Sequence, residues 1–200
     1  MKIVKPGFVI EDQIDGMAML QRIERAGRTC YKSEAKITET SAAAFVRKII
    51  ASGHESVLEH EKVTVRIVCD RGVSHEIVRH RLASYSQEST RYCDYGKVGE
   101  IDFIIPCWLT EDSDHYPYWL WSMQQAESEY KQLRAWGWSP QQARCVLPNS
   151  LKTEIVMTAN LREWRHFFKL RTAPAAHPQM REIAVPLQEE FRRLIPVVFE

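Results

Sequence analysis

The sequence lacks the short motifs by which many chains bind phosphates, metals or membranes. It has only eight glycines, and they form neither a G-x-G turn nor a G-x-x-x-x-G-K-S/T loop, which excludes the common glycine-rich nucleotide motifs. The five cysteines are odd in number and include no C-x-x-C pair, so neither a disulfide framework nor a cysteine zinc site is expected. The longest apolar runs, 42–46 and 194–199, are too short to span a bilayer.

Charge of one sign is not in excess either. The chain carries 27 basic and 26 acidic residues, so no overall field favours DNA or an acidic membrane as a partner. A chain of 200 residues can bury roughly 70% of its unfolded surface, and we expect a single domain over 1–200. Acidic residues replace the apolar stretch of a signal peptide near the start. Together with the unpaired cysteines, this predicts a soluble cytoplasmic protein.

Helical and strand-like patterns interleave irregularly along the chain. Period-two alternation predicts strands over 2–10, 61–70 and 151–158, and a short apolar run predicts another over 102–106. Helical spacing predicts helices over 15–28, 39–52, 73–81, 117–136, 160–170 and 178–193, with another from 140 to before 148. Gly53 is expected to end a helix, and Ser139 and Asn160 to begin one. The pattern predicts an α+β fold, with a mixed or antiparallel sheet packed against several helices.

Two local patterns suggest a metal or a nucleophile, and neither is convincing. His75 and His80 are five positions apart, which places them roughly 140° apart on a helix, so they would diverge rather than share a zinc ion. We therefore expect no metal site. Cys107 follows an apolar, strand-like run, where a buried structural thiol is the usual occupant.

The segment 79–92, RHRLASYSQESTRY, is the densest polar stretch of the chain. Ser89, Thr90 and Arg91 place hydroxyl donors beside a guanidinium, a combination that suits a phosphate monoester. A solvated loop with surface arginines is the simpler alternative. Single-stranded nucleic acid is another, with tyrosines stacking on bases, although the neutral overall charge weighs against it.

Four segments in order resemble one family. Arg79-His80-Arg81, followed by seven residues and Ser89, resembles the R-H-R-x7-S signature of the flavin-dependent thymidylate synthases. The segments 54–60, 143–148 and 160–162, the last running on to 170–171, resemble other parts of the same family. Residues 109–140 match no motif of it.

The resemblance implies an activity and a set of partners. Such enzymes convert dUMP to dTMP, with methylenetetrahydrofolate as carbon donor and NADPH as reductant through FAD. It also implies a homotetramer with sites shared between subunits, and neither a nucleic acid nor a membrane as partner. No enzyme thiol serves as nucleophile, which agrees with the unpromising cysteines.

The resemblance also implies the site residues. Residues expected at FAD are His54, Ser56, Arg79, His80, Arg81, Gln87, Asn160, Arg162 and His166. Residues expected at the nucleotide, with Thr90 added for its hydroxyl, are Glu76, Arg79, Gln87, Ser89, Thr90, Arg91, Arg144 and Arg171. Arg171 matches the activating arginine, whose guanidinium would stabilise negative charge on the uracil imide and so enrich C5 in electrons. Some members have Gln where this chain has Glu76, and Glu where it has Gln87.

Simpler roles stay open for several of these residues. Ser56 could cap a turn, His54 could be an ordinary turn residue, and His166 a partly buried helix residue. Arg144 could pair with a nearby acid, and Arg171 could be a favourable charge at a helix C-terminus. Two other functions also stay open: a related flavoenzyme that modifies pyrimidine C5 differently, for example by hydroxymethylation, and a non-catalytic nucleic-acid-binding module.

Overall fold

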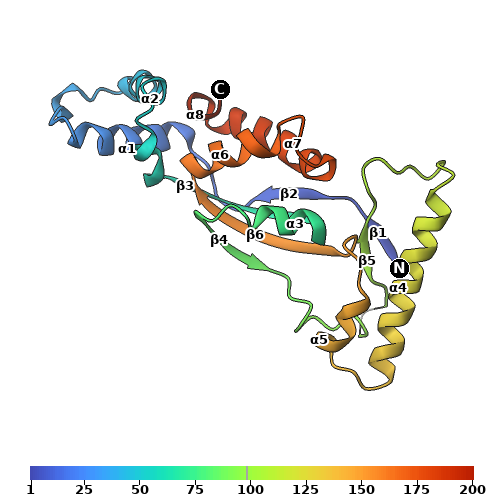
Figure 1. The fold of residues 1–200 in the computed structure, drawn as a ribbon. Coiled ribbons are helices and arrows are strands. Elements are labelled where there is room, and N and C mark those ends of the chain that lie inside the picture. The colour runs from blue at the N-terminus through green and yellow to red at the C-terminus, as the bar shows by residue number, and fades with distance from the viewer. Residues whose placement is uncertain (98) are drawn as a thin grey trace. The chain divides into compact units, whose positions relative to one another are not determined.

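A computed structural model describes residues 1–97 and 99–200 of the chain (Figure 1). These residues form two compact units. Unit 1 consists of Met1–Phe8, Arg66–Arg79 and Tyr85–Val156. Unit 2 consists of Val9–Val65, His80–Ser84 and Met157–Glu200. The expectation of a single domain over 1–200 stays a prediction.

The strands form two sheets, which together with the helices confirm the predicted α+β class. Four strands, in the order β2-β3-β6-β4, are Gly7–Ile10, Lys62–Asp70, Lys152–Asn160 and Ala83–Gln87. A parallel pair joins β1 (Lys2–Val4) to β5 (Asp102–Ile104). Buried residues alternate along β3 and β6, including Val63, Val65 and Ile155, because successive side chains of a strand face opposite sides of the sheet.

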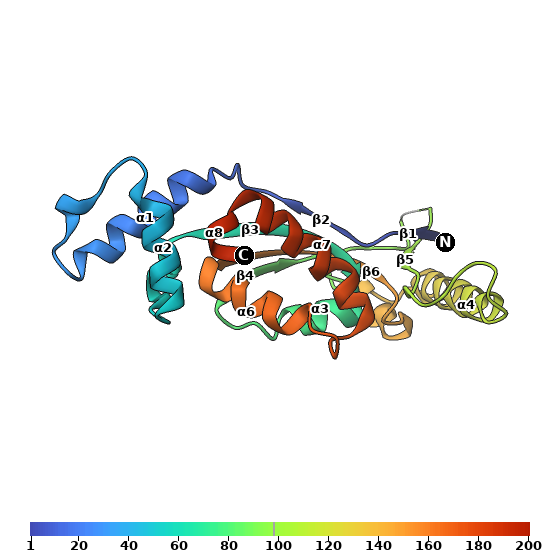
Figure 2. The ribbon, with the colours of Figure 1, turned by 90° about the horizontal axis from the view of Figure 1, so that it is seen from above.

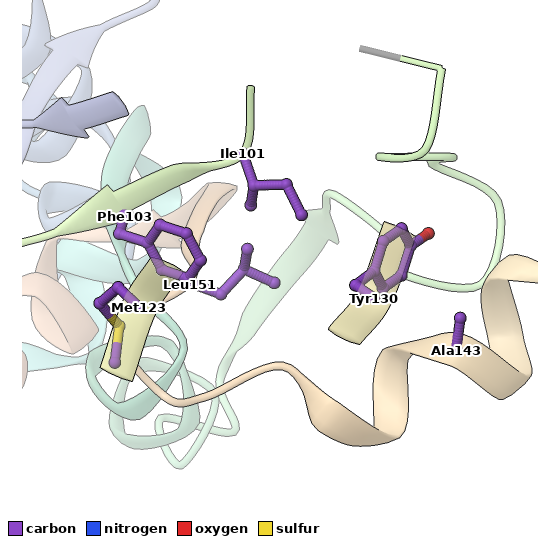
Figure 3. Packing of buried hydrophobic residues seen from close by; sticks show 6 residues of the cluster. All are labelled: Ile101, Phe103, Met123, Tyr130, Ala143 and Leu151. Carbon is purple, nitrogen blue, oxygen red and sulfur yellow. The ribbon is translucent and has the colours of Figure 1, made fainter. Parts of the chain in front are cut away.

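Unit 1 is built around a small apolar cluster and one long helix. Its helices are α3 (Arg71–Ile77), α4 (Tyr116–Ala135), α5 (Pro140–Ala143) and the short 3-10 helix η3 (Arg144–Val146). Phe103 and Leu151 form an antiparallel bridge, and Figure 3 shows their side chains close to Met123. The cluster also contains Ile101, Tyr130 and Ala143. Ser139 begins α5 as predicted, and its backbone N–H donates to Gln142 Oε1 at 2.9 Å.

Unit 2 is mostly helical and its core is aromatic. It contains α1 (Gly16–Thr29), η1 (Glu34–Lys36), α2 (Ser41–Ala51), η2 (Glu55–His60), α6 (Leu161–Arg171), α7 (Pro178–Leu194) and α8 (Pro196–Phe199). The Trp164 ring lies 5.7 Å from the Phe168 ring and 5.0 Å from the Phe191 ring, centroid to centroid. The Trp164 indole also donates to the Val63 carbonyl at 3.0 Å. Figure 2 shows α6 and α7 side by side, with α8 after them.

Glycines explain two local features of unit 2. Gly53 has φ +74 after α2, so the predicted helix end is confirmed in the left-handed conformation that glycine adopts without a steric penalty. Gly27 lies inside α1 rather than ending it. A Cβ at that position would come within 2.7 Å of the Phe45 ring, so the missing side chain is what allows α1 and α2 to pack closely.

Several predicted boundaries were wrong for identifiable reasons. The strand expected over 2–10 divides between Val4 and Gly7, where Pro6 offers no N–H to a ladder. Part of the polar segment 79–92 forms the strand β4, which was not predicted, because the sheet overrides the local composition. Cys107 is exposed rather than buried, since β5 ends at Ile104. Among the described residues, no helix combines the length and apolar character that a bilayer crossing would need.

Candidate active site

One cavity of unit 2 has a wall made by α6. Its volume is about 710 Å³. On the α6 side it is lined by Asn160, Arg162, Glu163, Arg165, His166 and Lys169, and elsewhere by Glu55, Glu59 and Leu82, among others. Arg162, His166 and Lys169 lie on one face of α6 because residues three or four apart neighbour each other on a helix. Asn160 caps this helix as predicted, since its Oδ1 accepts from the Glu163 backbone N–H at 2.8 Å.

The cations of this cavity are partly balanced by acids. Arg162 Nη1 lies 2.6 Å from Glu59 Oε1, and Arg165 Nη2 lies 3.2 Å from Glu55 Oε1. Arg162 and Glu59 are both about half exposed, so their ion pair is weak and an anionic ligand could exchange with the carboxylate. The cavity thus offers guanidinium and ammonium donors without a large unbalanced charge.

A chain of hydrogen bonds connects the buried end of this region to Arg171. His80 Nδ1 lies 3.0 Å from Glu163 Oε1, and Arg171 Nε donates to His80 Nε2 at 3.0 Å. The imidazole packs on Phe167 with ring centroids 4.9 Å apart. Burial lowers the pKa of His80, and the neighbouring Arg171 guanidinium lowers it too, against the opposing effect of Glu163. The ring is therefore neutral at neutral pH.

His80, Glu163 and His166 bring possible metal-ligand atoms within 4.8 Å of one another. Both ring nitrogens of His80 already have a hydrogen-bond partner, one in Glu163 and one in Arg171. A metal ion would have to replace one of these bonds beside a permanent positive charge. We interpret the group as a hydrogen-bonded chain.

Unit 1 carries a second polar cavity, of about 450 Å³. Arg144 Nη1 donates to the Thr90 hydroxyl at 3.1 Å, and both residues line the cavity. Ser89 and Arg91 adjoin Thr90 in a turn, where the Arg91 backbone N–H donates to Ser89 Oγ at 3.3 Å. Arg91 is exposed, with its guanidinium carbon 5.5 Å from the Tyr92 ring centroid. Thr90 and Arg144 thus bring a hydroxyl and a guanidinium together in one cavity of unit 1.

Gln87, also in unit 1, is held by two hydroxyls. Its Nε2 donates to Ser74 Oγ at 2.9 Å and to Thr153 Oγ1 at 3.3 Å. Ser74 Oγ donates its own proton to the Arg71 carbonyl at 2.9 Å. It must therefore accept from Gln87, which fixes the end of the amide that donates. Gln87 lines a separate hollow of about 440 Å³.

The comparison with protein families identifies the chain's relatives. The family model described as thymidylate synthase complementing protein matches residues 14–197. A flavin-dependent thymidylate synthase of Pyrococcus furiosus is 38% identical over 170 residues, which cover 84% of this chain and 69% of that one. Another, of Geobacter sulfurreducens, is 35% identical over 181 residues, covering 87% and 78% respectively. The chain belongs to the flavin-dependent thymidylate synthase family.

The fold is similar to that of a solved structure. A UMP/dUMP methylase, PolB from Streptomyces cacaoi, bound with 5-Br dUMP, aligns with a TM-score of 0.79 at 24% identity. The alignment covers 100% of this chain and 95% of that one. At this identity the likeness concerns the fold.

Five of the expected site residues line the two cavities. In unit 2, Asn160, Arg162 and His166 line the large cavity. In unit 1, Thr90 and Arg144 line the smaller one. Outside these two cavities lie five expected residues that are exposed, namely His54, Ser56, Arg79, Arg81 and Arg91.

The simpler roles can be compared with the observed contacts. The recorded partner of Arg144 is the Thr90 hydroxyl rather than an acid. Arg171 does end α6, but its side chain also contacts His80. His166 is exposed rather than partly buried.

Sequence reasoning missed the contact role of Glu163 and the lining residues Arg165, Lys169 and Leu82. For Glu163 a signal existed. Glu163 precedes Phe167 by four positions in α6, so it lies on the apolar face of that helix. An unpaired carboxylate there would be costly, which indicates that Glu163 has a partner.

Proposed function

We propose that this protein converts dUMP to dTMP, with methylenetetrahydrofolate as carbon donor and NADPH as reductant through FAD. The observation that carries the proposal is the family match over residues 14–197, which includes the R-H-R-x7-S segment from Arg79 to Ser89.

The cavity of unit 2 suits FAD in size and in its donors. Its volume of about 710 Å³ lies within the roughly 300–1,000 Å³ of typical ligand pockets. Arg162 and Lys169 offer positive charge to phosphate oxygens, while Leu82 and the exposed His166 offer an apolar contact and a flat ring. When bound there, FAD would carry reducing equivalents from NADPH to the nucleotide.

Arg171 is the residue proposed to activate the uracil. A guanidinium beside the imide stabilises negative charge on N3 and its neighbouring oxygen. Electron density at C5 then rises, which lets the ring attack an activated methylene without a covalent cysteine adduct. The bond from Arg171 Nε to His80 Nε2, at 3.0 Å, supports this role because it orients the guanidinium.

The dUMP phosphate is assigned to the hydroxyl and guanidinium groups of unit 1. Ser89, Thr90, Arg91 and Arg144 combine donors that form strong bonds to a phosphate dianion. Glu76 is assigned to the base or sugar, since a carboxylate would repel the phosphate. Gln87 is assigned there as well, as its amide is already oriented by Ser74 and Thr153.

We further propose a homotetramer whose sites are shared between subunits. Light scattering coupled to size exclusion should then give about four times the chain mass of 23.3 kDa. A monomer that is fully active would refute the shared site.

The visible absorption spectrum is the first test of the function. Purified protein should show flavin absorbance, as isolated or after incubation with FAD. It should also release tritium from 5-tritiated dUMP when methylenetetrahydrofolate and NADPH are supplied. Protein that never binds FAD, and that instead binds polynucleotides in a steeply salt-dependent way, would support the nucleic-acid-binding alternative. Mass spectrometry of the product separates methylation from hydroxymethylation.

A further inference from the structure

Three side chains in unit 2 form a single line of hydrogen bonds. The Glu163 carboxylate lies 3.0 Å from His80 Nδ1, and His80 Nε2 accepts from Arg171 Nε at 3.0 Å. Glu163 is 6% exposed and His80 is 4% exposed, so water competes little for either bond. Such buried, charge-assisted bonds are stronger than their exposed counterparts.

The direction of each bond follows from the chemistry of arginine. A guanidinium is always a donor, so His80 Nε2 must be the lone-pair nitrogen. The proton of the neutral ring is therefore on Nδ1, and it points at the Glu163 carboxylate. One tautomer of His80 satisfies both neighbours, and the other would set two N–H groups against each other.

Helix α6 supplies both ends of this line. Glu163, Phe167 and Arg171 follow one another at intervals of four residues, so they form a stripe along one helix face. His80 lies against this stripe and touches all three, with its ring 4.9 Å from that of Phe167. Glu163 is itself fixed in the first turn, where its backbone N–H donates to Asn160. These hydrogen bonds thus connect Asn160, at the start of α6, to Arg171 at its end.

We propose that Glu163 is a positioning residue that acts through His80 to fix the plane of the Arg171 guanidinium. The inference rests on the proposed function, in which Arg171 meets the uracil imide. A guanidinium is planar, so a bond at Nε sets the direction of both terminal nitrogens. Setting that direction before the nucleotide binds lowers the entropic cost of forming the productive geometry.

The line of bonds depends on the charge state of His80. A protonated ring has no lone pair at Nε2, so it cannot accept from Arg171, and two cations would then face each other. The charged or titratable groups recorded around His80 are Glu163, Arg171 and His166. Because the pKa of His80 is lowered from 6.5, turnover should fall as pH decreases below that value. Glu163 opposes this shift, because its carboxylate raises the pKa of His80. Removing the charge of Glu163 should therefore lower that pKa further and move the decrease in turnover to still lower pH.

Two variants of Glu163 separate its hydrogen bond from its charge. Glu163→Ala removes the acceptor, and kcat should fall by about tenfold to a hundredfold with a smaller change in KM for dUMP. Glu163→Gln keeps an oxygen acceptor for His80 Nδ1, so it should restore most of kcat at neutral pH. The acid limb of its pH profile, over which kcat falls as pH decreases, should lie at lower pH than that of the unmodified protein. An unchanged kcat in Glu163→Ala, or an unshifted limb in Glu163→Gln, would overturn the proposal.

The matched control is Glu61→Gln. Glu61 is another buried acid of unit 2, at 8% exposure, and it accepts from Arg22 Nη2 at 2.8 Å away from His80. This variant should leave the acid limb unchanged. A shift of the same size in the control would mean that the limb reports general destabilisation, and would count against the proposed role of Glu163.

A readout independent of turnover separates this proposal from the proposed function. In protein labelled with ¹⁵N at histidine, the seven rings give signals that distinguish the two tautomers, and His80→Gln identifies the His80 signal by its loss. His80 should be neutral with its proton on Nδ1 in the unmodified protein, and should lose this fixed tautomer in Glu163→Ala. A proton on Nε2 would overturn the positioning role. If the tautomer is as expected but no dTMP forms with any combination of substrates, the proposed function fails and the hydrogen-bonded line stands.

Discussion

The two groups of proposed site residues, one in each unit, differ in how far their side chains are already committed to fixed partners. In unit 2, His80 is buried and hydrogen-bonded from both ring nitrogens. In unit 1, Arg144 and Arg91 are exposed, and the Arg144 guanidinium donates to a neutral hydroxyl. A group that must hold one orientation benefits from burial and fixed partners. A group that must take up a charged ligand is better kept hydrated until the ligand arrives, because burying it beforehand has a large desolvation cost.

The hydrophobic cores of the two units differ as well, in the size of their side chains and in how completely these are buried. Unit 2 places Trp164 among the aromatic rings of α6, α7 and α8. The unit 1 cluster is smaller, and partly buried residues such as Trp119 and Leu133 complete it. We infer that the scaffold behind Arg171 is the more rigid of the two.

The largest expected effect tests that rigid scaffold. Trp164→Ala removes a fully buried ring and its bond to the Val63 carbonyl, and should lower the free energy of unfolding by about 3–5 kcal/mol. Urea denaturation followed by circular dichroism measures the change. Trp136 in unit 1 is 70% exposed, and Trp136→Ala should stay within about 0.5 kcal/mol. Equal losses in both variants would contradict the role of buried Trp164 in holding the core of unit 2 together.

Arg171→Ala tests the unit 2 residues, whose side chains already have fixed partners. It should reduce dTMP formation by about a hundredfold to a thousandfold, as expected when an electrostatic stabiliser of developing charge is lost. Flavin absorbance should persist. Arg171→Lys should recover little, because an ammonium cannot reproduce the planar fork that faces both His80 and the imide. Substantial turnover in Arg171→Ala would assign the activation of the uracil to another group.

Arg144→Ala tests the unit 1 residues, whose cationic side chains are exposed. Losing one charge-assisted bond to phosphate should raise KM for dUMP by about tenfold, with a smaller change in kcat and none in FAD affinity. The exposed Arg193, which pairs with Glu190 in unit 2, provides the control, since Arg193→Ala should leave KM unchanged. An effect of Arg144→Ala on FAD affinity instead would reverse the division of roles between the cavities.

The smallest expected effect concerns the thiols. Cys107 is exposed and has no place in the proposed chemistry, so Cys107→Ala should keep its turnover within about twofold of the unmodified protein, as for most surface substitutions. The tritium-release assay measures this directly. A folded but inactive Cys107→Ala protein would contradict a thiol-free mechanism.

Local patterns predicted most elements of the fold because they depend on short-range chemistry. The period-two burial of β3, the cap at Asn160 and the glycine at the end of α2 are all legible in a few neighbouring residues. The break at Pro6 could have been read from the same chemistry. The strand over Ala83–Gln87 could not, since its polar sequence gains a strand conformation only from the sheet it joins.

The same distinction between local patterns and long-range contacts applies to the candidate site. Motif resemblance placed Asn160, Arg162 and His166, and the structure brings them to one cavity. The link from Glu163 to Arg171 through His80 joins residues more than eighty positions apart, and no local spacing encodes such a contact. The sequence offered only an acid on an apolar helix face as a hint of it.

The close approach at Gly27 has a practical consequence. Because the Phe45 ring occupies the space where a Cβ would be, the α-protons of Gly27 lie within the ring current of that aromatic side chain. Their proton resonances should therefore be displaced from ordinary glycine values for as long as α1 and α2 are paired. This pair of helices thus carries an intrinsic spectroscopic probe of its own assembly, which needs neither a label nor a substitution.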